Sequence, residues 1–286
     1  MKKAIIAVIV TAAAIPMAMS LTTIKNSEIT NENKDVTNVA TEGSKVNSGI
    51  EARDSTIKNS KITNVNQNVT NKASGGSTIN SGIQVNKSDI QDSKIENRNT
   101  KVENTATEGS FINSGVTAND AVIKNSTISN INDGVNNKAS KGSAINSGIM
   151  ADKSEIKNST ITNTNKKVNN TADDGSIINS GIVATGAKIN DSVITNTNEK
   201  VNNTATGGSV INSGISASDA QIKNSTITNT NKNVTNIADG KSKINSGIIV
   251  DGADIKDSKI TNTNTNVNNT ATGASTVNSG IDLGGN

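Results

Sequence analysis

Residues with fixed identity alternate with variable residues along most of this chain. Residues 155–187 show the pattern in three runs, in which every second residue recurs in all copies of the segment and only the isoleucines of the third run vary, to valine. The fixed positions are Ser159, Ile161, Asn163, Asn165, then Val168, Asn170, Ala172, then Ser176, Ile178, Ser180, Ile182. A period of two is typical of β-strands with one buried face, whereas a helix would show a period of 3.6.

The tetrapeptide Asn-Ser-Gly-Ile sets the period of the whole chain. It begins at Asn47, Asn80, Asn113 (here with Val), Asn146, Asn179, Asn212, Asn245 and Asn278, and the interval is 33 every time. Eight such units therefore fill Thr23 to Asn286 without insertion or deletion. A fixed period of this length is the signature of a stacked repeat array. We predict an all-β fold, a β-solenoid of eight tandem repeats over residues 21–286.

Each repeat can be divided into similar halves. Ser159 and Ser176 each begin a run, and Ile161 then matches Ile178. We therefore favour two rungs per repeat, and sixteen rungs at ~4.8 Å would make a rod on the order of 75 Å long. A single three-sided rung per repeat is the alternative.

Stacking in register predicts columns of identical residues. Isoleucine and valine would form apolar columns, and inward asparagines would hydrogen-bond to their copies above and below. The variable segments around Lys166-Lys167, residues 173–175 and Thr185-Gly186 are typical of exposed turns. The invariant outward glycine of Asn-Ser-Gly indicates either a bulge or a close backbone approach, and the sequence leaves the role of this motif open.

Residues 1–20 have the features of a signal peptide. Lys2 and Lys3 precede an apolar stretch from Ala4 to Ile15 that is too short to span a membrane, and Ala18-Met19-Ser20 predicts cleavage after Ser20. We expect a bacterial-type export signal over this segment, a secreted or cell-surface location, and no membrane association after cleavage.

Composition excludes several classes of function. The chain has no Cys, His, Trp or Tyr, and its only Phe is Phe111. Stability must therefore come from strand pairing and packing rather than from disulfides. The formal net charge of +3 and the two arginines, Arg53 and Arg98, give no argument for nucleic acid as a partner. The same order of residues repeated eight times is not typical of a disordered chain, although the low aromatic content would fit one.

One spacing resembles a known family. Ser159, Asn165, Asn170 and Ala172 follow the pattern Ser-x5-Asn-x4-Asn-x-Ala. This is similar to the repeat of the curli major subunit, a bacterial extracellular functional amyloid, whose pattern is Ser-x5-Gln-x4-Asn-x-Ala-x3-Gln. In all eight units the first Gln is replaced by Asn (Asn33, Asn66, Asn99, Asn132, Asn165, Asn198, Asn231 and Asn264) and the second by Ser. The resemblance implies a secreted fibre subunit of a biofilm matrix.

We expect neither a catalytic nor a cofactor or metal site. Catalysis needs a nucleophile with a base, or two tuned carboxylates, and most carboxylates occupy variable positions. Asp92, Asp191 and Asp257 share one position, but the other units have Asn there, which favours tolerated structure. No carboxylate recurs in every copy of the turn where a calcium-binding β-roll would need one.

The sequence thus predicts a structural protein that is not an enzyme. We expect self-assembly into an extracellular fibre through end-to-end stacking of uncapped rungs, with other matrix or cell-surface components as further partners. A cell-surface adhesin rod is one alternative. Another is an ice-binding protein, because Thr162 and Thr164 recur at the matching positions of the last three units.

Overall fold

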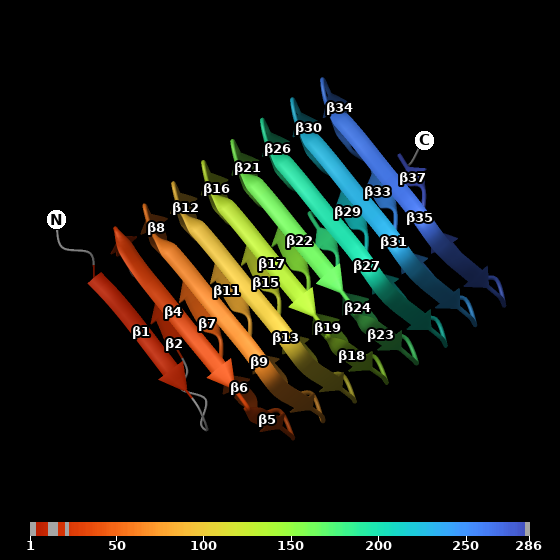
Figure 1. Cartoon of the computed structure of the whole chain (residues 1–286), viewed down its shortest axis with the longest axis horizontal. Coiled ribbons are helices and arrows are strands. Elements are labelled where there is room, and N and C mark those ends of the chain that lie inside the picture. The colour runs from red at the N-terminus through yellow and green to blue at the C-terminus, as the bar shows by residue number, and fades with distance from the viewer. Residues whose placement is uncertain (1–3, 11–16, 21–22, 284–286) are drawn as a thin grey trace.

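The computed structural model describes residues 4–10, 17–20 and 23–283. Throughout this part the chain is all β and contains no helix, and hence no helix able to cross a membrane. The strands stack in parallel as a β-solenoid whose rungs follow one another from the N-terminal to the C-terminal end (Figure 1). The expected fold class is confirmed.

Each rung is one whole repeat, so the prediction of two rungs per repeat is wrong. Strands pair with the strand one full repeat away, as in Ile128 with Ile161 and Ile161 with Ile194. The two halves of a repeat therefore belong to different sheets of the same rung. Eight rungs at ~4.8 Å give a rod roughly 38 Å long, half the length expected for sixteen.

Each rung contributes one segment to each of four sheets. The sheet with the longest strands is called the long sheet, and the other three are named after their strand in the first rung. The long sheet contains β1 (Ala4–Val10), β4 (Ser27–Lys34), β5 (Thr37–Ala40), β9 (Lys61–Ala73), β13 (Lys94–Ala106), β17 (Thr127–Asp133), β18 (Asn136–Ala139), β22 (Thr160–Lys166), β23 (Asn169–Ala172), β27 (Val193–Ala205), β31 (Thr226–Ala238) and β35 (Lys259–Ala271). The β6 sheet contains β6 (Lys45–Asn47), β10 (Thr78–Asn80), β14 (Phe111–Asn113), β19 (Ala144–Asn146), β24 (Ile177–Asn179), β28 (Val210–Asn212), β32 (Lys243–Asn245) and β36 (Thr276–Asn278).

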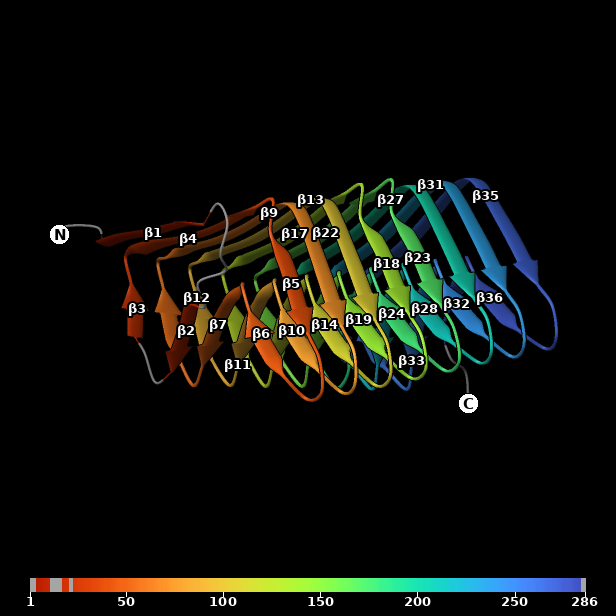
Figure 2. The same ribbon diagram turned by 90° about the horizontal axis from the view of Figure 1, so that it is seen from below.

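The other two sheets complete the cross-section. The β7 sheet contains β2 (Met17–Ser20), β7 (Ile50–Arg53), β11 (Ile83–Asn86), β15 (Val116–Asn119), β20 (Ile149–Asp152), β25 (Ile182–Val183), β29 (Ile215–Ser218), β33 (Ile248–Asp251) and β37 (Ile281–Asp282). The β3 sheet contains β3 (Thr23–Lys25), β8 (Thr56–Lys58), β12 (Asp89–Gln91), β16 (Val122–Lys124), β21 (Glu155–Lys157), β26 (Lys188–Asn190), β30 (Gln221–Lys223) and β34 (Asp254–Lys256). Figure 2 shows the rungs turning from the long sheet into the shorter ones.

Residues in the left-handed conformation turn the chain at its corners. The long sheet bends within each rung at such a residue, for example Asn68 (φ 52°), Gly134 (φ 68°) and Lys167 (φ 53°). Asparagine, aspartate and glycine adopt this conformation most readily, which explains why they are common at the corners.

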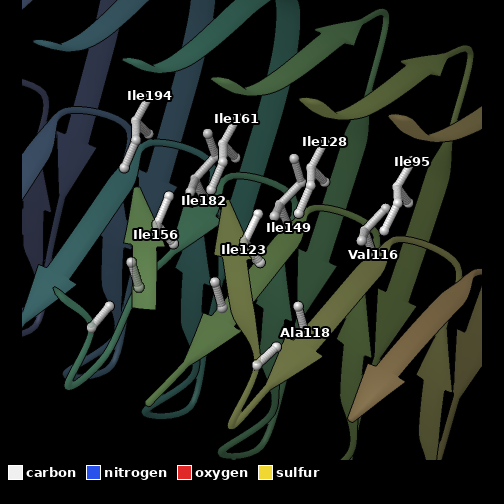
Figure 3. Close-up of a cluster of buried hydrophobic side chains, with 14 of the residues drawn as sticks. Ile95, Val116, Ala118, Ile123, Ile128, Ile149, Ile156, Ile161, Ile182 and Ile194 are labelled. Carbon is white, nitrogen blue, oxygen red and sulfur yellow. The ribbon is translucent and has the colours of Figure 1, made fainter. Parts of the chain in front are cut away.

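The apolar interior consists of columns of one residue type. The main core lies between the β3 sheet, the first half of the long sheet and the β7 sheet, and Figure 3 shows Ile95, Ile128, Ile161 and Ile194 in one such column. A second core joins alanines of the long sheet to isoleucines of the β6 sheet. The inward positions expected from the period-two pattern, such as Ile161, Val168 and Ile178, are buried as predicted.

Candidate functional site

Buried asparagines form continuous ladders along the solenoid, as the sequence predicts. Asn163 Nδ2 donates to Asn196 Oδ1 of the next rung at 2.8 Å and to the Ser180 carbonyl oxygen at 2.5 Å. Asn163 Oδ1 accepts from Asn130 Nδ2 of the preceding rung at 2.8 Å. Parallel ladders pass through Asn165 and Asn170. In all three ladders the amide donates toward the C-terminal end, so the two ends of the ladder are chemically different.

The Asn-Ser-Gly motif forms the corner between the β6 and β7 sheets, and each of its residues has a distinct role. Ser180 lends its carbonyl oxygen to Asn163 and Asn165 and donates its hydroxyl to Asn170 Oδ1 at 2.8 Å. Asn179 Nδ2 donates to Asn146 Oδ1 at 2.9 Å, which makes a fourth ladder that runs the opposite way.

The glycine of the motif allows a close backbone approach between rungs. Of the two explanations that the sequence left open, a bulge and a close approach, the structure therefore supports the second. A Cβ placed on Gly181 would lie 2.0 Å from the Gly214 carbonyl oxygen of the next rung, closer than any real contact. Gly280, in the last rung, is different, because the nearest atom to its Cβ would be Asn278 Oδ1 at 3.8 Å. A side chain at position 280 would clash only if another rung were stacked on the last one, because the clash in earlier rungs is with the glycine carbonyl oxygen of the following rung.

The C-terminal end of the described solenoid leaves its last rung half covered. Ile255, Ile260 and Val267 are only partly buried, whereas their counterparts one rung earlier are fully buried. Asn262 Nδ2 donates to the Ser279 carbonyl oxygen at 2.5 Å, as in every rung. In earlier rungs the second amide hydrogen is donated to the asparagine of the next rung, as Asn229 Nδ2 does to Asn262 Oδ1. Residues 23–283 contain no further rung to accept this bond from Asn262. This end therefore presents amide donors and apolar side chains.

The N-terminal end presents the complementary groups. Asn31 Oδ1 and Asn33 Oδ1 are buried and have no hydrogen-bond partner in the described part of the chain. In every later rung the same oxygen accepts from the preceding rung, as Asn64 Oδ1 does from Asn31 Nδ2 at 2.8 Å. A buried acceptor without a partner costs about 1–3 kcal/mol.

Two strands from the predicted signal peptide lie where a preceding rung would lie. β1 pairs with β4 and opposes Val8 to Asn31 and Val10 to Asn33, and β2 pairs with β7. The valine side chain has no hydrogen-bond donor, so this pairing cannot replace the asparagine that precedes every later rung. Residues 1–3, 11–16 and 21–22, which include the end of the predicted apolar stretch, lie outside the described residues.

The threonines considered for ice binding form two parallel rows on the long sheet. Thr162, Thr195, Thr228 and Thr261 pair in register, as do Thr164, Thr197, Thr230 and Thr263. In the first four rungs the second row is interrupted by Glu32, Val65, Arg98 and Ile131. The continuous part of this face thus covers only the C-terminal half of the rod.

The recurring aspartates are not brought together. Asp92, Asp191 and Asp257 occupy left-handed corners with φ near 50°, three and two rungs apart. Asn125 Nδ2 donates to Asp92 Oδ1 and Asn224 Nδ2 to Asp191 Oδ1, both at 3.2 Å, so these carboxylates serve corner ladders. Among the described residues no group of three or more His, Cys, Asp or Glu side chains could hold a metal ion.

Charged side chains on the surface pair along and between rungs. Hydrogen bonds from Lys94 and Arg98 lower the pKa of Glu96. A hydrogen bond to Glu28, at 2.7 Å, raises the pKa of Lys61. Both groups lie on the outer face of the long sheet, and their shifts reflect ordinary surface ion pairs.

Sequence reasoning found the ladders but missed that their ends are complementary. The direction of an amide ladder depends on which oxygen each Nδ2 faces, and residue identities do not show this. No protein-family model matches the chain, and no curated protein matches it either.

Proposed function

We propose that this protein is the subunit of an extracellular homopolymeric fibre, which assembles by stacking the last rung of one copy on the first rung of the next. The observation that carries the proposal is the pair of oxygens of Asn31 and Asn33, which lie at one end of the solenoid and have no hydrogen-bond partner in the described part of the chain. The other end offers the amide groups of Asn262 and Asn264, which occupy the same two columns. Stacking would give each orphaned acceptor a donor.

The surfaces of the two ends also match. In a stack, Lys259 would lie beside Glu28 of the next copy, which repeats the pairing of Lys61 with Glu28 inside the chain. Asn266 would lie beside Asp35 of the next copy, as Asn68 does inside the chain at 2.8 Å. One junction pair is unfavourable, Asp282 against Glu51, but Glu51 is already paired with Arg53.

Assembly in this manner requires the first rung to be uncovered. Cleavage after Ser20, as the sequence predicts, would remove β1 and β2 and leave β3, which begins at Thr23, intact. The rung of residues 23–55 would then expose its strands to the last rung of another copy. The fibre would be one solenoid wide, with strands perpendicular to its axis.

Gly280→Ala tests this junction directly. The substitution has room in the isolated rod, but in a stack its methyl group would meet the Gly49 carbonyl oxygen of the next copy, as Gly181 would meet Gly214. We expect residues 21–286 to form fibres in negative-stain electron microscopy, with a meridional diffraction spacing of ~4.8 Å. The Gly280→Ala variant should stay folded by circular dichroism and remain as short rods. Fibres of the variant, or uniform monomeric rods of the parent chain, would contradict the proposal.

Ice binding is a second candidate, favoured by the two in-register threonine rows of β22, β27, β31 and β35. The rows repeat at ~4.8 Å along the rod and at roughly 6.6 Å along each strand, a regular grid of hydroxyl and methyl groups. The measurement is ice-crystal shaping by the double variant Thr197→Lys/Thr230→Lys. The matched control is Thr171→Lys/Thr204→Lys, on the second half of the long sheet. Shaping lost only in the first variant would support ice binding, and no shaping by the parent chain would exclude it.

A further inference from the structure

One outward column of the β3 sheet is occupied by lysine in six of the eight rungs. Parallel pairing aligns these residues in a straight row along the rod. The lysine row, in order and including its two uncharged members, is Lys25, Lys58, Gln91, Lys124, Lys157, Asn190, Lys223 and Lys256. No acidic residue occupies the column in any rung. Its seven intervals extend roughly 34 Å at ~4.8 Å per rung.

Most of these lysines have no partner of opposite charge. Lys124 Nζ lies 3.9 Å from Glu155 Oε1, and the described residues contain no ion pair for the other five lysines. Asp89 is hydrogen-bonded instead by Gln91 Nε2, at 2.9–3.0 Å. Other acidic residues nearby in the sequence are Asp254 on the same sheet, Glu28, the three aspartates next to Gln91, Asn190 and Lys256, and Asp54, Asp120 and Asp219 at the opposite corner of the sheet. The row is therefore a line of positive charge that forms one ion pair within the described part of the chain.

Stacking like charges directly opposite one another destabilises a sheet. Neighbouring outward columns avoid it by mixing residue types: the other column of the β3 sheet holds Thr, Asp, Val, Glu, Lys and Gln. The lysine row shows no such mixing. Pairing within the sheet does not account for this repetition, whereas a partner of opposite charge would offset the repulsion.

We propose that the lysine row binds a linear acidic polysaccharide, a chain of uronic acid residues laid along the rod. Such a polymer carries one carboxylate on every sugar and can extend in a straight line, so successive carboxylates can meet successive lysines. The amides of Gln91 and Asn190 can bond to sugar hydroxyls, since each offers both a donor and an acceptor.

Nucleic acid fits this surface less well. Single strands are held by aromatic side chains on which the bases stack, and the β3 sheet has none. Duplex DNA presents its phosphates along a helical path with one charge per ~1.7 Å of axis, whereas the lysine row is straight. The sheet also lacks arginine, the residue best shaped for bidentate contact with phosphate.

The test compares two variants of equal net charge. The row variant changes all six lysines of the row to glutamine, which already occupies position 91. The control variant changes six exposed lysines of the long sheet to glutamine: Lys34, Lys72, Lys138, Lys166, Lys200 and Lys232. Both are made in the Gly280→Ala background, so that fibre formation does not affect the binding, and circular dichroism checks their folding. Binding to immobilised polygalacturonate is measured against its fully methyl-esterified form, which is neutral.

We expect the parent chain to bind polygalacturonate and not the esterified polymer, with affinity falling steeply as salt increases. The row variant should lose at least about tenfold in affinity, and the control variant less than about twofold, since only the row follows the polymer. Equal losses in both variants would show general charge attraction and overturn the proposal. Tighter binding to duplex or single-stranded DNA than to polygalacturonate would also overturn it. These outcomes do not depend on whether the protein forms fibres.

Discussion

The glycine of each Asn-Ser-Gly corner has space for a hydrogen atom but not for a methyl group. The Cβ of an alanine at position 181 would lie 2.0 Å from the Gly214 carbonyl oxygen, so two rungs would have to separate or shift. We expect Gly181→Ala to lower the free energy of unfolding by roughly 3 kcal/mol or more, the upper end of what overpacking costs. Chemical denaturation followed by circular dichroism measures the change, and Gly280→Ala is the matched control that should be nearly neutral. A stable Gly181→Ala variant would show that the rungs are not packed this closely.

The asparagine ladders make a second prediction at the scale of single residues. Asn163→Ala removes the bonds to Ser180 and Asn196 and leaves Asn130 Nδ2 and Asn196 Oδ1 each without one partner. At about 1–3 kcal/mol for each buried orphan, the variant should be destabilised by roughly 2–6 kcal/mol. The exposed neighbour Asn169, changed to alanine, should cost less than about 1 kcal/mol. Equal effects of the two changes would mean that the buried ladder contributes nothing special.

Several properties of these residues could be predicted from the sequence. Identity at every second position across eight copies showed which side chains face inward, and the placing of asparagine among them indicated the ladders. The glycine contact could not be identified, because a bulge and a close approach require the same residue. The lysine row was overlooked because charge was counted over the whole chain, where it nearly cancels. Sorting charge by repeat position would have revealed it.

At the scale of strands, the size of the rung was the main error. Ser159 and Ser176 both begin a run with an inward isoleucine, and this likeness suggested two rungs. The further match was poor, since Asn163 corresponded to Ser180 and Asn165 to Ile182. Matching over a whole repeat was complete for the same positions. A buried amide ladder needs the same amide in every rung, so complete identity was the stronger indication.

Deletions can confirm the rung size without a new structure. Removing residues 155–187 deletes one whole rung and joins equivalent positions, so the shortened chain should fold with slightly lower stability, as repeat arrays do. Removing only residues 155–171 would place the β6 sheet strands of one rung against the long sheet of another. We expect that variant to lose cooperative unfolding in thermal denaturation. Two deletion variants of similar stability would favour half-repeats as the true structural unit.

At the scale of the whole molecule, the N-terminal strands are expected to control assembly. β1 and β2 pair with the edges of the first rung that a second copy would need. The chain with residues 1–20 retained should therefore form fibres much more slowly than residues 21–286, at the same concentration. Light scattering followed by electron microscopy measures the difference. Equal rates would mean either that these strands detach readily or that the first rung is not the junction.

The curli resemblance implied a fibre subunit, and the fold is compatible with that role. The resemblance did not indicate how the subunits would meet, whereas the difference between the two ends suggests a head-to-tail junction. In the sequence the first and last repeats look equivalent, because nearly all of their inward residues are the same. In the structure the three ladders through Asn163, Asn165 and Asn170 leave oxygens at one end and amide hydrogens at the other, while the fourth ladder, through Asn179, runs the opposite way.

The ladders through Asn163, Asn165 and Asn170 run in the same direction, so a fibre built by stacking these rods would be polar. Two rods meeting by their C-terminal faces would set donor against donor, and two meeting by their N-terminal faces would set acceptor against acceptor, so neither mirror-like junction is stable. Every copy must then point the same way, and the two tips of one filament must add new copies at different rates. In a filament that starts at a cell surface, all subunits would have the same orientation relative to that surface. The distal tip would then always expose the same end of the molecule.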